Sequence, residues 1–188
     1  MGEALKRQNQ NTYKQFLAIP KDLEGTKYMD SEIILQAMTN LNNQSIVLNI
    51  VREFTDYFKC KKCNPFIAPF DIVLGKEKEE IKGIQPDIFI VCGEKPSNQN
   101  EFMGIPTLII EVTSPSNPRN DIVTKLKLYK MFGVNEYWRV SPKNKSAEVF
   151  EFDELTRKYK EPILYLRNDI VNSNAFNDLS IELKKIFK

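Results

Sequence analysis

The chain has no histidine among its 188 residues, and this absence removes several classes of site. Ser-His-Asp and Cys-His nucleophilic sites, histidine zinc sites and histidine general bases are all excluded. Carboxylate, lysine, tyrosine and hard-metal chemistry remain possible. With only three cysteines, the chain cannot build a four-cysteine zinc site. Cys60 and Cys63 have C-x-x-C spacing without a second ligand pair, so we expect ordinary loop thiols, with redox or metal use as the alternative.

The chain also lacks an apolar run of membrane-spanning length, and polar residues rather than an apolar signal core follow its N-terminus. Together with cysteines that we expect to be unpaired, this predicts a cytoplasmic protein that does not bind membranes. The 27 basic and 25 acidic residues nearly balance, so the net charge of +2 says little about nucleic acid. Any basic surface must therefore be local.

The length suits one domain over residues 12–188, after a flexible N-terminus at 1–11. Hydrophobic periodicity and turn residues predict a set of elements. Helices are expected at 12–17, 44–58, 121–132 and 179–187, and Asn42 or Asn43 can cap the second of these. Strands are expected at 32–35, 71–74, 87–92, 108–113, 136–141, 147–152 and 159–166, with a charged hairpin tip at 75–83 and a loop at 93–104. This order predicts an α/β protein with a mixed sheet flanked by helices.

Two acids lie in strands that otherwise read as core. Asp87 begins the apolar run 87–92, and Glu111 lies inside the run 107–112. Strand alternation places Ile109 and Glu111 on one face, so pairing of the two strands would bring both carboxylates into one cleft. Carboxylate oxygens together with water suit magnesium. The alternatives are a turn or N-cap acid for Asp87 and a buried salt bridge for Glu111.

Lys125 is the cation that this cleft would use. On a helical wheel it lies on the apolar side, whereas Lys127 points outward. Lys125 could reach back over the sheet to the two acids, orient the attacking water and stabilise phosphate charge. Alternatively, it pairs with Asp121 or packs only its stem.

The segment that follows Glu111 supplies candidate substrate-binding groups. Ser114, Ser116 and Arg119 lie in a strand-to-helix connection, where hydroxyls and a helix N-terminus suit phosphate. Lys61 and Lys62 are weaker candidates for a basic surface.

A run of motifs resembles one known family. The motifs are Gln85-Pro86-Asp87, the stretch from Gly104 to Ser116 (GIPTLIIEVTSPS), Asp121 with Lys125 and Tyr129, and the stretch from Gly133 to Val140 (GVNEYWRV). They are similar to motifs of the Uma-two family, restriction-endonuclease-like proteins of the PD-(D/E)-x-K nuclease superfamily. The similarity runs from about residue 13 to the C-terminus.

The resemblance implies a restriction-endonuclease-like fold and a hydrolytic metal site. Asp87 and Glu111 match the metal-binding acids, Thr113 occupies the place of the superfamily's usual lysine, and Lys125 is that lysine displaced to the next helix. The chain departs from the family pattern at Lys27, at Ser31, and at Asn43, which replaces a common histidine. In the same N-terminal segment, Glu32 is a possible additional acid of the site.

The leading hypothesis is a DNA endonuclease that uses Mg²⁺ or Mn²⁺, with Asp87, Glu111 and Lys125 as its catalytic residues. We expect DNA as its partner, a homodimer as its assembly and no organic cofactor. One alternative is a catalytically inactive nuclease-fold protein that binds nucleic acid or a protein partner. Another is a structural dimer module built on the exposed hairpin and Trp138, although Trp138 is better explained as a core residue.

Overall fold

The computed structural model describes residues 26–29, 32–35, 41–74, 82–93, 101–114 and 119–188. The predicted helix at 12–17, most of the hairpin tip and the flexible N-terminus lie outside these residues. The helices are α2 (Leu41–Phe58), α3 (Arg119–Phe132) and α4 (Leu183–Ile186). The strands are β1 (Thr26–Met29), β2 (Glu32–Leu35), β3 (Cys63–Ile67), β4 (Asp71–Leu74), β5 (Lys82–Ile84), β6 (Ile88–Cys92), β7 (Glu101–Met103), β8 (Leu108–Val112), β9 (Glu136–Ser141), β10 (Ser146–Asp153), β11 (Lys158–Tyr159), β12 (Ile163–Leu166), β13 (Ile170–Asn172) and β14 (Ser180–Glu182).

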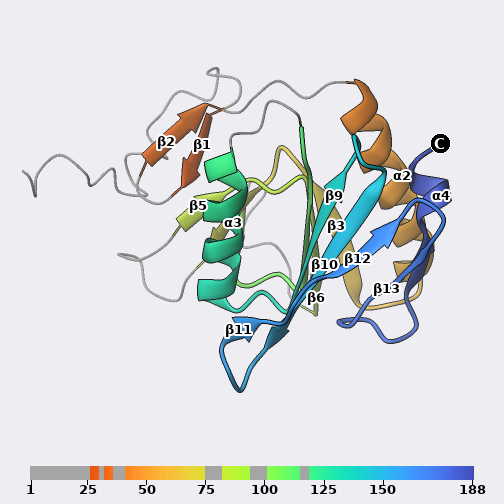
Figure 1. The fold of residues 1–188 in the computed structure, drawn as a ribbon. Helices are drawn as coiled ribbons and strands as arrows, with labels where there is room; N and C mark the ends of the chain where they lie inside the picture. The colour runs from red at the N-terminus through yellow and green to blue at the C-terminus, as the bar shows by residue number, and fades with distance from the viewer. Residues whose placement is uncertain (1–25, 30–31, 36–40, 75–81, 94–100, 115–118) are drawn as a thin grey trace, which may run out of the picture.

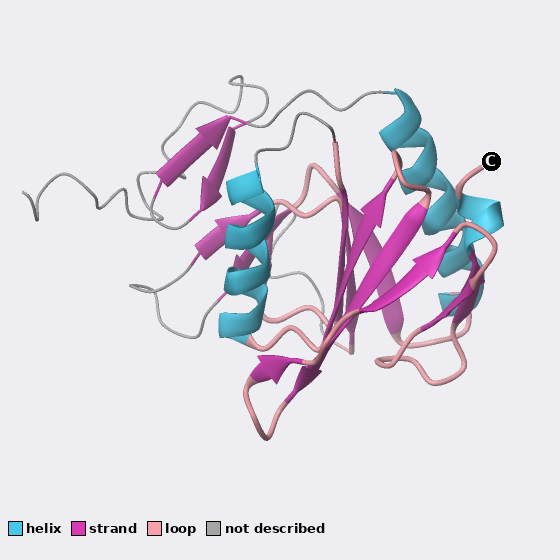
Figure 2. Cartoon of the chain, in the orientation of Figure 1, coloured by secondary structure: helices cyan, strands magenta, loops and turns pink. Residues whose placement is uncertain are grey.

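A seven-stranded mixed sheet forms the centre of the molecule (Figures 1 and 2). Its order is β11-β10-β9-β8-β6-β3, and β12 also pairs with β10. Strands β8 and β9 are parallel because α3 connects them, whereas the other pairs in this sheet are antiparallel. The predicted α/β architecture is thus confirmed.

The two faces of this sheet are covered by different helices. Helix α3 lies on one face, and α2 and α4 lie on the other (Figure 1). Strand β8 is buried on both faces, and its alternation sends Leu108, Ile110 and Val112 toward the α2 side. Ile109 packs on the α3 side. The predicted assignment of faces in β8 is correct, and it places Glu111 beneath α3.

Helix α2 begins at Leu41, three residues before the predicted start. Asn42 and Asn43 therefore lie inside the helix, so their prediction as caps was wrong. The apolar periodicity starts only at Ile46 and cannot locate a first turn made largely of polar residues. Asn43 is itself buried at the start of this helix.

Several edge elements differ from the prediction. Strands β1, β3, β5, β7, β13 and β14 were not predicted, and they are three to five residues long. The single strand expected at 159–166 is two strands, β11 and β12, separated by a segment that includes Pro162, which has no N–H to donate. The closing helix expected at 179–187 is β14 followed by the four-residue α4.

Two cysteines form a disulfide, which corrects the expectation of unpaired thiols. Cys63 and Cys92 lie directly opposite each other in β3 and β6 and are bonded, whereas Cys60 is free and exposed. The C-x-x-C pair is therefore not the one that forms. The sequence could not predict this pairing because β3 was not predicted. Since two of the three cysteines are bonded, the cysteines no longer support a cytoplasmic location.

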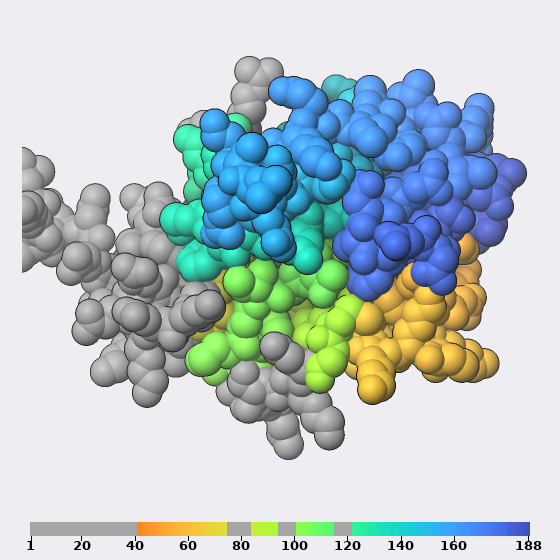
Figure 3. Space-filling model, turned by 90° about the horizontal axis from the view of Figure 1, so that it is seen from below, coloured from red at the N-terminus to blue at the C-terminus, as the bar shows by residue number. Residues whose placement is uncertain are grey.

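The C-terminal segment packs against α2. In the space-filling view, the dark blue C-terminal residues lie beside the orange residues of α2 (Figure 3). The Asn49 side chain donates to the Ile186 carbonyl at 3.0 Å, and the Phe58 and Phe176 rings meet edge to face. Among the described helices, none is long and apolar enough to cross a membrane.

The central strands should dominate stability. Ile110→Ala removes a fully buried side chain between β6, β9 and α2, and it should lower the free energy of unfolding by about 2–5 kcal/mol. Leu155→Ala is the control, because Leu155 is 96% exposed and its loss should change stability by less than about 0.5 kcal/mol. Urea unfolding measures both. Equal unfolding midpoints for the two variants would contradict this account of the core.

Candidate active site

The site is centred on a buried carboxylate. Glu111 lies in β8 and is 5% exposed. Its Oε2 accepts a hydrogen bond from Lys125 Nζ at 2.5 Å, and its Oε1 accepts one from the Tyr129 hydroxyl at 2.6 Å. An unpaired buried carboxylate would be very costly, and these two bonds are what make its burial possible.

Helix α3 supplies both donors from one face. Lys125 and Tyr129 are four residues apart, so their side chains lie one above the other over β8. Both are buried, and Lys125 is also 5% exposed, whereas Lys127 is exposed as the helical wheel predicted. The structure therefore brings Lys125 to Glu111. The two form a buried salt bridge, which was the alternative role expected for Glu111.

The Tyr129 hydroxyl keeps its proton at physiological pH and can donate a hydrogen bond. Burial raises the pKa of its phenol well above the ordinary value, and the negative charge of Glu111 raises this pKa further. Asp87 contributes to the same rise in pKa, which places it within electrostatic reach of this group. The phenol is therefore neutral at physiological pH and keeps Glu111 oriented.

Asp87 lies beside Glu111 through the pairing of β6 and β8. Ile88 is opposite Ile110, so Asp87, one residue before β6, reaches the end of β8 that carries Glu111. Its Oδ2 accepts a hydrogen bond from the Val112 backbone N–H at 2.8 Å. Asp87 is only partly buried. It thus has the role of a turn acid that ties two strands together, and it also stands at the edge of the site.

These two acids fit a cation that keeps several waters. Within the described part of the chain, no group of three histidine, cysteine, aspartate or glutamate residues forms a ready-made cage. Two carboxylates are nevertheless the donor set that Mg²⁺ uses when substrate and water complete its octahedron. A carboxylate oxygen can accept a hydrogen bond and bind a cation at the same time, so the bonds from Lys125 and Tyr129 do not prevent Glu111 from being a ligand.

The other residues predicted for the site are only partly covered by the structure. Ser114 follows β8 and is partly buried, while Arg119 opens α3 and Glu32 opens β2, with side chains outside the description. Ser116 lies outside the described residues. Lys61 forms an ion pair with Asp178 at 2.7 Å.

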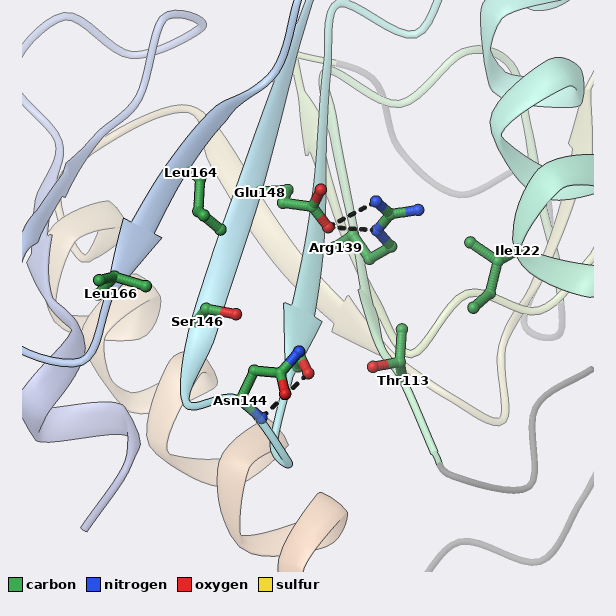
Figure 4. Close-up of a pocket in the computed structure, with 9 residues that line it drawn as sticks. Thr113, Ile122, Arg139, Asn144, Ser146, Glu148, Leu164 and Leu166 are labelled. Atoms are coloured by element: carbon green, nitrogen blue, oxygen red, sulfur yellow. Dashed lines mark hydrogen bonds and ion pairs between the residues drawn. The ribbon is translucent and has the colours of Figure 1, made fainter. Parts of the chain in front are cut away.

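A polar pair next to Glu111 was missed by the sequence reasoning. In the register of β8 and β9, Glu111 is opposite Arg139, and Arg139 is opposite Glu148 in β10. Both Nε and Nη2 of Arg139 lie 2.6 Å from Oε2 of Glu148 (Figure 4). The available signal was the hairpin at 136–152, which sets this cross-strand alignment.

A second buried acid shows that burial alone does not indicate chemistry. Glu136 opens β9 and is fully buried, and burial raises the pKa of its carboxyl. It accepts hydrogen bonds from the Trp138 indole, the Ser173 hydroxyl and the backbone N–H groups of Asn174 and Ala175. Glu136 therefore anchors the C-terminal loop. It also places Trp138 in the core, as predicted.

Comparisons with known proteins bear on the family and on the fold. A family model named Uma2 and described as "Putative restriction endonuclease" matches residues 13–184. A crystal structure of a protein from Anabaena variabilis, described as a putative nuclease belonging to DUF820, has a similar fold with a TM-score of 0.78. The two are 18% identical, and the similarity covers 94% of this chain and 97% of the other. No curated protein matches the chain.

The Glu111–Lys125 pair makes a quantitative prediction about stability. Lys125→Met should lower the free energy of unfolding by about 3–5 kcal/mol, because it leaves Glu111 buried without its cation. The double variant Glu111→Gln with Lys125→Met should lose much less than the sum of the single losses. Urea unfolding of the four proteins completes the cycle. A Lys125→Met cost below about 1 kcal/mol would mean that the pair is solvated rather than buried.

Proposed function

The chain belongs to the Uma2 family, and on that basis we propose that it is a divalent-metal-dependent endonuclease that hydrolyses phosphodiester bonds in DNA. The observation that carries this proposal is Glu111, buried beside Asp87 and held by Lys125 and Tyr129. This arrangement concentrates two acids and one ammonium group at a single end of the central strands.

In the proposed site, Asp87 and Glu111 would hold Mg²⁺ or Mn²⁺. A bound divalent ion would supply a Lewis acid that neutralises charge on the phosphate oxygens. Asp87 is partly exposed, so it lies on the side from which substrate would arrive. Tyr129 and Lys125 fix the position of Glu111 before substrate binds, which removes a reorganisation step from the reaction.

Lys125 is proposed to stabilise negative charge on the reacting phosphate. The Lys125 ammonium group donates to Glu111, so its positive charge lies at the proposed metal site. This charge would stabilise the negative charge that develops on a phosphate oxygen there. The low exposure of Lys125 strengthens that interaction, because little water screens it.

DNA binding and dimer formation are also part of the proposal. With a net charge of only +2, affinity for DNA would depend on a local basic surface and would fall as salt rises. The alternative, a nuclease-fold protein that binds nucleic acid or a partner without cleavage, is distinguished by metal binding. Both oxygens of Glu111 are already bonded within the chain, which is the observation in its favour.

Metal binding gives the first test. Calorimetry with Mn²⁺ should show one site in the wild type and lose it in Asp87→Asn and in Glu111→Gln. The new amide of Asp87→Asn keeps an oxygen that can accept from the Val112 N–H. Glu111→Gln keeps an oxygen for a donor on α3 but leaves Lys125 buried without its anion, so binding is measured at a temperature where this variant is folded. Equal Mn²⁺ affinity in all three proteins would reject these acids as ligands.

Cleavage gives the second test. Under single-turnover conditions with Mn²⁺, Lys125→Met should cut DNA at least roughly a hundredfold more slowly, the scale of losing one preorganised donor. The assay must be run at a temperature where the variant is folded, because the same change weakens the core. Lys127→Met is the matched control, since Lys127 is exposed on the same helix. If both variants cut at the wild-type rate, Lys125 has no part in catalysis.

A further inference from the structure

A cavity of about 500 Å³ lies on the α3 face of the sheet, next to the candidate active site (Figure 4). Helix α3 covers the β8 side of this face, and the β9, β10 and β12 side carries the cavity. Its lining residues are Thr113, Ile122, Arg139, Ser141, Asn144, Ser146, Glu148, Leu164 and Leu166. Both structural elements of the active site contribute, since Thr113 follows β8 and Ile122 lies one turn before Lys125 on α3.

The register of the strands links this cavity directly to Glu111. Glu111 is opposite Arg139, Arg139 is opposite Glu148, and Glu148 is opposite Leu164. Residues opposite each other share a face, so these four form one row across β8, β9, β10 and β12. With neighbouring strands about 4.8 Å apart, the row runs about 14 Å from the active-site acid to the leucine. A DNA strand bound at Glu111 can therefore continue into the cavity.

The chemistry of the lining favours a nucleobase over a phosphate. The only ionic groups that line the cavity, all within the described residues, are Arg139 and Glu148, and their charges cancel in the ion pair. The Arg139 guanidinium also lies over the Phe150 ring, at 5.5 Å from its centroid, so its plane is held in place. A neutral, preoriented pair does not attract phosphate but can recognise a flat polar ring.

The pair offers the cavity a donor at one end and an acceptor at the other, because the guanidinium nitrogen not bonded to Glu148 points away from it (Figure 4). In the described structure, Nη1 of Arg139 and Oε1 of Glu148 make no hydrogen bond, because both contacts use Nε, Nη2 and Oε2. The edge of a nucleobase carries both donors and acceptors, so either end of the pair can bond to it. The Ser146 hydroxyl also points into the cavity (Figure 4).

The rim adds apolar surface for the faces of the ring. Leu164 and Leu166 are 58% and 55% exposed, and Ile122 stands on the opposite side of the cavity. Exposed leucines beside a polar floor are typical of a ligand site, in which apolar contact supplies area and a few polar groups set orientation.

We propose that this cavity binds one unpaired nucleobase of the substrate strand, next to the phosphate that is cut. The proposal rests on the proposed nuclease function and adds where the strand lies and which part of it is read. An unpaired base is required because the edge and both faces of the ring must be accessible, as in single strands or flipped nucleotides.

Binding without cleavage tests this directly. Fluorescence anisotropy in EDTA would compare a labelled single-stranded octanucleotide with an abasic octamer of the same length and charge. The wild type should bind the base-bearing strand roughly tenfold more tightly, and Ser146→Phe, which fills the cavity, should abolish that preference. Ser180→Phe is the matched control, because Ser180 is exposed in β14 and outside the cavity lining.

A second pair of variants covers the case in which Ser146→Phe fails to fold. Leu164→Ala with Leu166→Ala removes only exposed apolar surface and should weaken base-bearing DNA several-fold, whereas Leu155→Ala should not. Equal wild-type affinity for the two octamers, or an equal loss for both in the cavity variants, would overturn the proposal. Cleavage with Mn²⁺ is scored separately: base preference without cleavage overturns only the nuclease function, and cleavage without preference overturns only the base site.

Discussion

Burial of the Glu111 carboxylate is the constraint on which the rest of the structure depends. An acid in the middle of a fully buried strand must be neutralised and hydrogen-bonded on the spot, and Lys125 and Tyr129 do both. Because these donors are four residues apart on α3, their bonds also determine where that helix sits on the sheet. The carboxylate at the centre of the proposed active site therefore also positions α3.

The placement of α3 has a second consequence on the same face. The helix covers β8, and the surface toward β12 remains available as the cavity beside Arg139 and Glu148. Arg139 is the direct cross-strand neighbour of Glu111, yet it pairs with Glu148, while Lys125 pairs with Glu111. Two ion pairs thus lie side by side. The buried one belongs to the proposed chemistry, and the partly exposed one belongs to the proposed recognition of substrate.

Sequence patterns predicted the parts of the fold that rest on long, regular periodicity. The central strands, α3 and the outward direction of Lys127 were correct, because burial on two faces or one face leaves a clear pattern. The short strands β3 and β7 and the split at Pro162 were missed, because their conformation is set by pairing with distant strands. The Cys63–Cys92 disulfide was missed for the same reason.

The site shows the same division between local pattern and distant contact. Alternation in β8 and the helical wheel of α3 were enough to predict that Lys125 faces Glu111. The bond from Tyr129 to Glu111 depended on where α3 packs on the sheet, and the neutral Arg139–Glu148 pair depended on strand register. Glu136 showed that a buried acid can serve only to anchor a loop.

The central claim is that Asp87 and Glu111 bind a divalent ion between them. Crystals soaked in Mn²⁺ and measured at a wavelength where manganese scatters anomalously would locate that ion without any assay of activity. The account predicts one strong anomalous peak within coordination distance of both carboxylates, with the Glu111–Lys125 and Glu111–Tyr129 bonds retained beside it. A fully soaked crystal with no peak at these carboxylates, or with its strong peak elsewhere, would contradict the account.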